Sequence, residues 1–243
     1  MTMTRNDFKV NKKILVSDVD SYGQMTLPSI VTDFMNTATL LSEQDNYGVR
    51  RMNELNLFWL TTKTRIMINK APLLLDDVSI STWNNIPNPK RCYKEYAMKK
   101  GDEVLVSGKT EWALYDPSLN KTVEVNRILP TSIEIDNFTF IPDNFRVFPS
   151  DFNGEVIGEY KCNSNDIDIG KHMHNVAYIK ALMSLFSCAT WHKLGVKDFE
   201  VHYLKPCLEG ETIVFSRMDK KNISYIKGLV NNNEVCQFIL EMA

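Results

Sequence analysis

The stretch NDIDIGKHMHNVAYIKALMSLF, from Asn165 to Phe186, places acidic residues, a glycine and two histidines directly before an apolar run with helical spacing. A second stretch, SDVDSYGQMTLPSIVTDF from Ser17 to Phe34, has the same order of residue types but no histidine. In both, an acidic turn leads into a helix, so the chain contains an internal repeat. The repeat predicts two halves with a turn and a helix at matching places in each.

The repeat also predicts which half carries the chemistry. When Asp20 is aligned with Asp168, Gln24 falls on His172. An imidazole exchanges a proton near neutral pH and a glutamine amide does not. We therefore expect one reactive site, in the second half, and a first half that is free to shape a binding pocket.

Apolar spacing predicts the buried face of each helix. The first helix has one apolar stripe, with Pro28 in the first turn, where proline is tolerated; the stripe consists of Ile30, Phe34, Met35, Ala38 and Leu41. The second has apolar residues on one side at Val176, Ile179, Leu182, Met183, Phe186 and Ala189, and on the other at Leu185, Cys188 and Trp191. We therefore expect a long second helix that is buried almost all round.

Segments with strand character follow each helix. In NLFWLTTKTRIMINKAPLLLDDVSISTW the alternating residues are Phe58, Leu60, Thr62, Thr64, Ile66 and Ile68, and DFEVHYLKPCLEGETIVFSRM repeats the plan. Within these segments Pro72 is expected to match Pro206, and Asp77 to match Glu211. Each half is therefore predicted to be a strand, a helix and several antiparallel strands.

A helix that is apolar on nearly all sides needs cover on nearly all sides, which a strongly curved sheet supplies. The pattern thus predicts an α+β double hotdog: residues 1–130 as the N-terminal hotdog half, 131–154 as a linker with little periodicity, and 155–243 as the C-terminal half that carries the catalytic motif. A two-domain α+β protein of another topology has a similar pattern.

Composition limits the function classes. With 44% hydrophobic and 24% charged residues the chain is a globular protein, and a net charge of −2 gives no general attraction for nucleic acid. No window reaches the roughly 20 apolar residues of a membrane span, and the N-terminal MTMTRNDFKVNKK lacks the apolar core of a secretory signal. We expect a cytoplasmic protein. The odd set of cysteines without a Cys-x-x-Cys pair predicts reduced thiols: Cys92, Cys162, Cys188, Cys207 and Cys236.

The residues before the second helix have a plausible chemistry of their own. A helix N-terminus offers unpaired amides and a positive dipole end, which stabilise a developing oxyanion. Asp168 would attack a carbonyl or orient a water as a base, and His172 would hold that water or the substrate. Gly170, without a Cβ, would let backbone amides approach the carbonyl. Asn175 has the position of a helix cap.

Other roles for these residues stay open. Acids before a helix are commonly caps and dipole partners, and histidines are commonly exposed polar residues. A calcium loop would need an acid where Ala177 stands. Zinc binding by His172, His174 and an aspartate lacks a third histidine at a suitable spacing. Cys207 is either a nucleophile or a small buried residue, and without a Gly-x-Ser-x-Gly motif a serine hydrolase is not expected.

The two motifs together resemble those of plant and bacterial acyl-acyl carrier protein thioesterases. NLFWLTTKTRIMINKAPLLLDDVSISTW is similar to the first-half signature of that family, and DIDIGKHMHNVAYI is similar to its second-half motif, in the right order and spacing. The resemblance covers most of the chain. It implies a double hotdog fold and hydrolysis of the thioester between a fatty acyl group and acyl carrier protein, without a cofactor or metal.

The resemblance carries over residue by residue with two departures. Asp168 and His172 match the family's aspartate and histidine, but Gly170 stands where the family has asparagine and Pro206 where it has glutamate. The segment HYLKPCLEG is more similar to the Tyr-x-x-Pro strand of single-hotdog acyl-CoA thioesterases. An acyl-CoA thioesterase and a non-catalytic acyl-binding module therefore remain as alternative functions. A hotdog dehydratase matches the two-half layout less well.

Substrate and partner contacts are also expected. Phe58, Trp59 and Cys207 are candidates for contacting the substrate, together with Leu60 and Met67. Lys90, Arg91 and Lys94 form a basic group beside a turn that would meet an acidic carrier protein; Arg50 with Arg51 form another. Two similar halves in one chain are compatible with a monomeric pseudo-dimer or with a homodimer.

Overall fold

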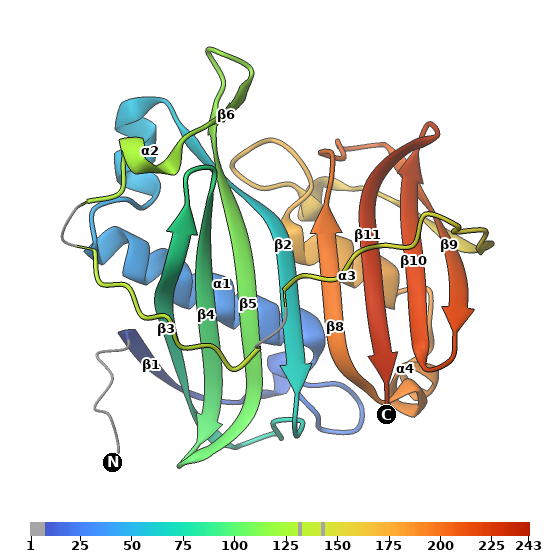
Figure 1. Ribbon diagram of the computed structural model, residues 1–243. Helices are drawn as coiled ribbons and strands as arrows, with labels where there is room; N and C mark the ends of the chain where they lie inside the picture. Colours follow the sequence, from blue (N-terminus) through green and yellow to red (C-terminus); the bar gives the residue numbers. More distant parts are fainter. Residues whose placement is uncertain (1–7, 131–132, 142–143) are drawn as a thin grey trace. The chain divides into compact units, whose positions relative to one another are not determined.

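The computed structural model describes residues 8–130, 133–141 and 144–243 (Figure 1). Residues 1–7 of the N-terminal MTMTRNDFKVNKK lie outside these ranges, as do residues 131–132 and 142–143 of the predicted linker. The chain forms two compact units: unit 1 is Met1–Thr61 with Asn69–Pro142, and unit 2 is Thr62–Ile68 with Asp143–Ala243. Residues 62–68 thus belong with the second unit, although they lie within the first half of the sequence.

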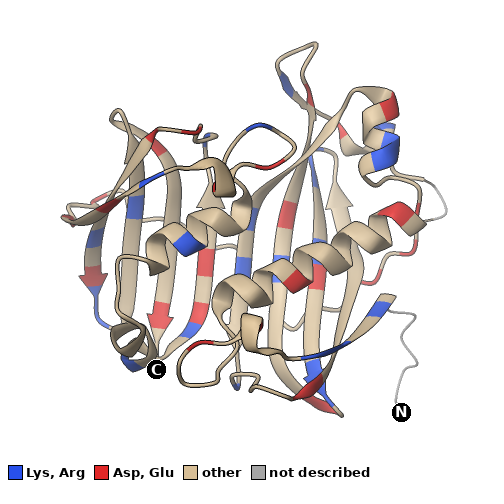
Figure 2. Ribbon diagram, turned by 180° about the vertical axis from the view of Figure 1, so that it is seen from behind, with Lys and Arg blue, Asp and Glu red and all other residues tan. Residues whose placement is uncertain are grey.

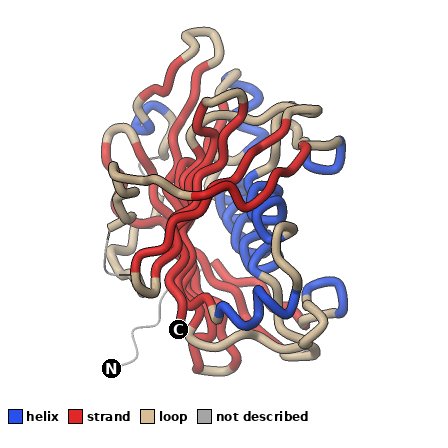
Figure 3. Tube along the Cα trace, turned by 90° about the vertical axis from the view of Figure 1, so that its right-hand side faces the viewer, coloured by secondary structure: helices blue, strands red, loops and turns tan. Residues whose placement is uncertain are grey.

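Unit 1 is an antiparallel sheet with a long helix on one face (Figure 3). The strand order is β1-β3-β4-β5, and β6 pairs with β5. The strands are β1 (Phe8–Lys13), β3 (Asp77–Asn88), β4 (Arg91–Lys100), β5 (Glu103–Asp116) and β6 (Lys121–Val123); the helices are α1 (Leu27–Gln44) and α2 (Val49–Leu55). Single-turn 3-10 helices cover Val16–Asp18 and Val125–Arg127. Phe34 of α1 stacks on Tyr96 of β4 with ring centroids 4.8 Å apart, so the core lies between α1 and the sheet.

Helix α1 begins where the sequence predicts. The Thr26 side chain accepts a hydrogen bond from the Ser29 amide at 3.3 Å, and Pro28 lies in the first turn. The predicted apolar stripe is confirmed, because all of its members are buried: Ile30, Phe34, Met35, Ala38 and Leu41.

Unit 2 repeats the plan. Strand β2 (Phe58–Ile68) pairs with β8 through residues 63–67, and the order continues β8-β11-β10-β9-β7, all antiparallel. The other strands are β7 (Glu155–Lys161), β8 (Val196–Tyr203), β9 (Thr212–Lys220), β10 (Ile223–Val230) and β11 (Asn233–Met242); the helices are α3 (Asn175–Met183) and α4 (Cys188–Leu194), with a 3-10 turn at Ser164–Asp166. Figure 2 shows α3 in front of the strands of this unit. The strand predicted from the alternation between Phe58 and Ile68 is confirmed.

The second helix is not the long, buried helix that the sequence predicts. It ends at Met183, and a separate helix starts at Cys188, which is exposed. Ser187 caps α4 by accepting from the Thr190 amide at 3.1 Å, and the Ser184 hydroxyl bonds to the Ala181 carbonyl at 2.7 Å. These serines give the backbone partners outside a continuous helix. Burial on several sides therefore holds only for α3.

The two halves match at a slightly different register from the predicted one. Met25 donates to the Pro72 carbonyl, and Met173 donates to the Cys207 carbonyl, both at 2.8 Å. Pro72 is therefore equivalent to Cys207 and not to Pro206. Alignment by residue type placed two prolines together, whereas backbone hydrogen bonds define the structural equivalence.

The predicted match of Asp77 with Glu211 is off by one residue in the same way. The Glu211 carbonyl accepts from the Cys162 amide at 2.8 Å, and the Asp76 carbonyl accepts from the Ile14 amide at 2.9 Å. Asp76, not Asp77, is thus the equivalent of Glu211.

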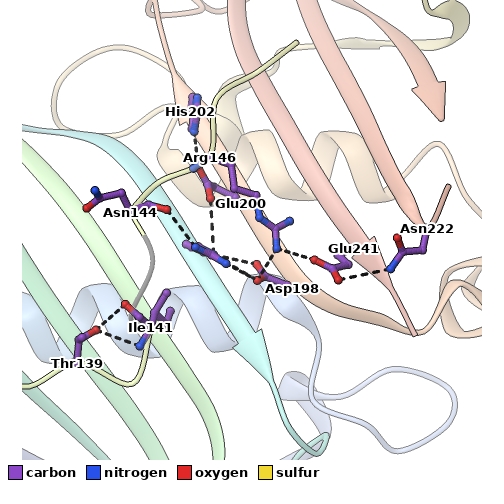
Figure 4. A network of polar contacts seen from close by, with 10 residues as sticks. Thr139, Ile141, Asn144, Arg146, Asp198, Glu200, His202, Asn222 and Glu241 are labelled. Carbon is purple, nitrogen blue, oxygen red and sulfur yellow. Dashed lines mark hydrogen bonds and ion pairs between the residues drawn. The ribbon is translucent and has the colours of Figure 1, made fainter. Parts of the chain in front are cut away.

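One face of β8 carries a buried charge network (Figure 4). Arg65 donates to Asp198 at 2.8 Å, and Arg146 donates to both Asp198 and Glu241 at 2.7 Å. The Arg146 amide also bonds to Glu200 at 2.9 Å. The network fastens the segment around Arg146 to the sheet of unit 2, and satisfies charges that would be unfavourable if buried alone.

Candidate active site

The acidic turn before α3 folds back on itself and is tied to the strand end beside it. The Asp168 amide donates to the His172 carbonyl at 3.1 Å, and the His174 amide donates to the Asp166 carbonyl at 2.7 Å. The bond from Met173 to Cys207 fastens the turn to the segment after β8. These backbone bonds hold the turn against the N-terminus of α3.

Asp168, Gly170 and His172 come together in this turn, as the sequence predicts. Asp168 Oδ1 accepts from the Gly170 amide at 2.7 Å and lies 3.8 Å from His172 Nδ1. Asp168 Oδ2 makes no hydrogen bond within the described residues. About a quarter to a third of each of the Asp168 and His172 side chains is exposed, at 27% and 32%, so both are open to a substrate.

The bonding of His172 defines which nitrogen can accept a proton. Nδ1 lies 3.3 Å from the Met173 carbonyl. Because a carbonyl only accepts, Nδ1 carries the hydrogen in this contact, and Nε2 presents its lone pair. Nε2 has no partner among the residues that the structure describes. A ring nitrogen with a free lone pair, partly exposed beside a carboxylate, has the chemistry of a general base.

Gly170 makes room for this arrangement. A Cβ at position 170 would lie 2.8 Å from His172 Nε2 and 3.0 Å from Asp168 Oδ1. A side chain would therefore force the imidazole or the carboxylate to move. The Gly170 amide is already bonded to Asp168, so the absence of a Cβ mainly leaves space for the His172 ring. The approach of backbone amides to a substrate carbonyl stays a prediction.

The helix cap is His174 and not Asn175. His174 Nδ1 accepts from the Val176 amide at 3.2 Å, and Asn175 is the first residue of α3. Cap preferences favour asparagine, but the bond from His174 to Asp166 places the histidine at the cap position. Burial lowers the pKa of His174, which keeps the accepting nitrogen unprotonated.

The two histidines therefore have different surroundings: the His172 side chain is partly exposed, and His174 caps α3. In the described ranges no group of three histidine, cysteine or acidic side chains is arranged to hold a metal ion.

Cys207 lies behind the turn and is fully buried. Burial raises the pKa of its thiol to about 12, which is unfavourable for a nucleophile. Its backbone is what the site uses: the carbonyl holds Met173, and its amide donates to the Tyr178 hydroxyl at 2.9 Å. Tyr178 also donates to the Lys205 carbonyl at 3.2 Å. Tyr178 is not among the predicted site residues, although its hydroxyl on an apolar helix face was a signal in the sequence.

Asp166 has a structural role. Its carboxylate accepts from the Asn163 amide at 2.9 Å and from the Tyr160 hydroxyl at 3.0 Å. The equivalent Asp18 of unit 1 accepts from the Leu15 amide in the same way, at 2.9 Å. Asp18 and Asp166 thus each close the turn in which they lie.

The first half provides an internal comparison for Asp168. Asp20 Oδ1 accepts from the Tyr22 amide at 2.9 Å and the Gln24 amide at 3.1 Å. Both aspartates therefore close the same kind of turn, and only the second has an imidazole beside it.

Phe58 and Trp59 belong to unit 1. The Trp59 indole nitrogen donates to the Tyr47 carbonyl at 2.9 Å, and its ring packs against a buried apolar cluster that includes Met52 and Leu114. Phe58 is 39% exposed. Their contact with substrate stays a prediction.

The prediction that Lys94 belongs to an exposed basic group is wrong. Its side chain is buried in unit 1, where Nζ donates to the Tyr47 hydroxyl at 2.8 Å and to Asn84 Oδ1 at 3.0 Å. Strand alternation turns Lys94 to the same side as Tyr96, into the core. Lys90 is exposed and Arg91 is half-buried, 3.5 Å from Glu111.

Family profiles match both halves of the chain. Residues 5–132 match the profile described as acyl-ACP thioesterase N-terminal domain, and residues 151–242 match acyl-ACP thioesterase C-terminal domain. Among the described residues no helix is long and apolar enough to cross a membrane.

Similar proteins include chloroplastic plant enzymes. An acyl-[acyl-carrier-protein] hydrolase of Cuphea viscosissima is 21% identical over 67% of this chain and 42% of its own length. A palmitoyl-acyl carrier protein thioesterase of Gossypium hirsutum is 20% identical over 77% of this chain and 47% of its own length. The chain thus spans less than half the length of the curated relatives it matches.

Two solved structures have the same fold over nearly the whole chain. An acyl-ACP thioesterase from Bacteroides thetaiotaomicron has a TM-score of 0.88 at 18% identity and covers 97% of each chain. The 12:0-ACP thioesterase from Umbellularia californica has a TM-score of 0.84 at 13% identity and covers 98% of this chain and 97% of its own. The predicted double hotdog fold is confirmed.

Proposed function

Because the chain belongs to the acyl-ACP thioesterase family, we propose that it hydrolyses the thioester between a fatty acyl group and acyl carrier protein, releasing free fatty acid. The observation that carries the proposal is the meeting of Asp168 and His172 over Gly170 at the N-terminus of α3. The proposal is supported by a carboxylate and an imidazole nitrogen without a partner among the described residues in the turn that leads into α3, and the proposed reaction uses no cofactor. The cytoplasm is the expected compartment.

Water is the nucleophile in the proposed mechanism. His172 Nε2 takes a proton from a water molecule that Asp168 Oδ2 orients, and the water oxygen attacks the thioester carbonyl carbon. The Asn175 amide, which has no partner among the described residues, and the positive end of α3 stabilise the developing oxyanion. The carbon–sulfur bond then breaks, and the carrier thiolate receives the proton from His172. Direct attack by Asp168 is the alternative first step.

The site is tested by matched substitutions in the two halves. Asp168→Asn and His172→Ala are each expected to lower kcat by at least about 100-fold, the lower end of general-base contributions. The controls Asp20→Asn and Gln24→Ala change the equivalent turn of unit 1 and should retain nearly full activity. Circular dichroism would show that all four variants are folded. Similar losses in both halves would contradict a single site in unit 2.

The acyl donor is tested separately. An acyl-CoA thioesterase is the second candidate, favoured by Pro206, which directly precedes Cys207, the residue whose amide donates to the Tyr178 hydroxyl. Hydrolysis of one acyl group presented on acyl carrier protein and on coenzyme A would distinguish the two. A higher kcat/KM for the coenzyme A thioester would identify coenzyme A, and not the carrier protein, as the preferred acyl donor. Acyl binding without turnover would support the non-catalytic module.

A further inference from the structure

Five large aliphatic side chains are exposed on two neighbouring turns of unit 1, one after β1 and one before β3. Backbone bonds join the turns: Leu75 donates to the Ile14 carbonyl, and Ile14 donates to the Asp76 carbonyl, both at 2.9 Å. Between 38% and 77% of each side chain is exposed, and the five residues, called the apolar patch below, are Leu15, Val16, Leu73, Leu74 and Leu75. Aliphatic side chains gathered in this way on a surface are typical of a contact with a partner.

Unit 2 shows that these turns do not require aliphatic side chains. Leu15 and Asn163 are equivalent, because each amide donates at 2.9 Å to the acid that closes its own turn. By this register and the one described above, the apolar patch corresponds in unit 2 to Asn163, Ser164, Leu208, Glu209 and Gly210. Of these only Leu208 is aliphatic. The same turns are therefore built with polar residues or glycine in unit 2, so the patch is a property of unit 1 and not of the fold.

Leu75 also has a backbone conformation that is unfavourable for leucine. Its φ angle is +69°, in the left-handed region, and the equivalent Gly210 has a φ angle of +86°. Each of the two amides donates to the equivalent carbonyl of its own unit at 2.9 Å. Glycine meets no steric penalty there, whereas a residue with a Cβ does. Unit 1 thus keeps a strained and exposed leucine at this position, which indicates a role outside folding.

The charged residues that flank the apolar patch neutralise one another. Three ion pairs with distances of 2.6–2.9 Å lie beside it: Lys12 with Asp18, Lys13 with Asp77, and Lys100 with Asp76. Because each lysine faces an acid, this rim has little attraction for an acidic carrier protein or for anionic lipid. The attraction that remains is that of the aliphatic side chains, which favours an uncharged, apolar partner.

The size of the apolar patch decides between the apolar partners. A stable protein interface takes about 20–30 residues from each side, whereas the patch has five residues on two turns. Aliphatic side chains on exposed turns enter the boundary between lipid headgroups and acyl chains, where binding grows with the apolar area that is buried. We propose that the apolar patch inserts into the surface of a lipid bilayer and attaches the protein to it reversibly. This inference goes beyond the proposed function and does not depend on it.

The test is binding of the full chain to phosphatidylcholine vesicles, measured by co-sedimentation without substrate. We expect part of the wild-type protein to sediment with the vesicles, with nearly the same partition coefficient at low and high salt, since charge contributes little. Leu74→Glu with Leu75→Gly introduces the residues of unit 2 and should lower the partition coefficient at least about tenfold. The control Leu119→Glu changes a leucine that is 50% exposed in the turn between β5 and β6, and it should bind like the wild type. The Tm should be retained in both variants.

Several results would overturn the inference. Wild-type protein that does not sediment with the vesicles, or binds no better than the double variant, would show that the patch does not insert into a bilayer. Dimers of the wild type that the double variant lacks, without vesicle binding, would assign the patch to a second copy of the chain. A raised KM of the double variant for acyl carrier protein substrates, without vesicle binding, would assign it to the carrier. Failure of the proposed function would appear separately, as absence of hydrolysis.

Discussion

At the scale of single residues, Lys94 has a buried amino group that donates to the Tyr47 hydroxyl and to Asn84 Oδ1. Burial lowers the pKa of Lys94 from an ordinary 10.5 to about 7, and the nearby Asp45 only partly opposes this effect. Between these two pH values the unfolded chain binds a proton that the folded chain does not. The free energy of unfolding therefore rises with pH through this window and is lowest below it.

Replacing Lys94 by methionine should remove this dependence. Tyr47 still donates to Asn84 at 2.6 Å, so no partner is left unsatisfied. We expect Lys94→Met to be more stable than the wild type at pH 7, with a difference that shrinks by about 2 kcal/mol at pH 9. Urea unfolding at the two pH values measures it. A difference that is independent of pH would mean that Lys94 is not perturbed in the folded state.

At the scale of elements, the start of α3 depends on an imidazole cap. His174 accepts from Val176 only when Nδ1 is unprotonated. Burial lowers its pKa, and Lys180 and His172 act in the same direction while Asp168 opposes them. The folded state therefore binds fewer protons than the unfolded state just below an ordinary histidine pKa. The contribution of the cap is present above pH ~6.5 and is lost as the pH falls.

Substitution at the cap separates its geometry from its titration. His174→Ala should destabilise the protein by about 1 kcal/mol at pH 7.5, the typical effect of losing a cap. His174→Asn keeps a side-chain acceptor that does not titrate, so it should lose less stability than the wild type between pH 7.5 and 5.5. Thermal unfolding at both pH values measures the change. Equal acid sensitivity in the wild type and His174→Asn would show that the cap does not titrate there.

At the scale of the whole molecule, a net charge of −2 gives no general attraction for an acidic protein, so the proposed carrier protein would dock on a local basic patch. With Lys94 buried, the patch at the turn between β3 and β4 is reduced to Lys90 and Arg91. We expect Lys90→Glu with Arg91→Glu to raise KM for acyl carrier protein substrates several-fold and to leave acyl-CoA hydrolysis unchanged. The effect should shrink as salt is added, since exposed charges are screened over about 8 Å.

The second patch, Arg50 and Arg51 of α2, supplies the comparison. The same double charge reversal there should have a smaller effect. Both arginines of α2 have an acidic neighbour, Glu54 at 2.8 Å from Arg51 and Glu43 at 4.0 Å from Arg50, whereas at the β3–β4 turn only Arg91 has one among the described residues, Glu111 at 3.5 Å. A larger effect at α2 than at the β3–β4 turn, measured at low salt, would move the docking site to α2.

Features that depend on local order could be predicted from the amino-acid sequence: the repeated acidic turns, the strand character of β2, the buried stripe of α1, and the closeness of Asp168 and His172 in one turn with Gly170. Each follows from spacings of a few residues, over which backbone geometry leaves few alternatives. The burial of Lys94, the use of His174 as helix cap and the break between α3 and α4 could be seen only in the folded chain. These depend on which distant segments cover a side chain or bond to a backbone group, and packing of that kind overrides local preference.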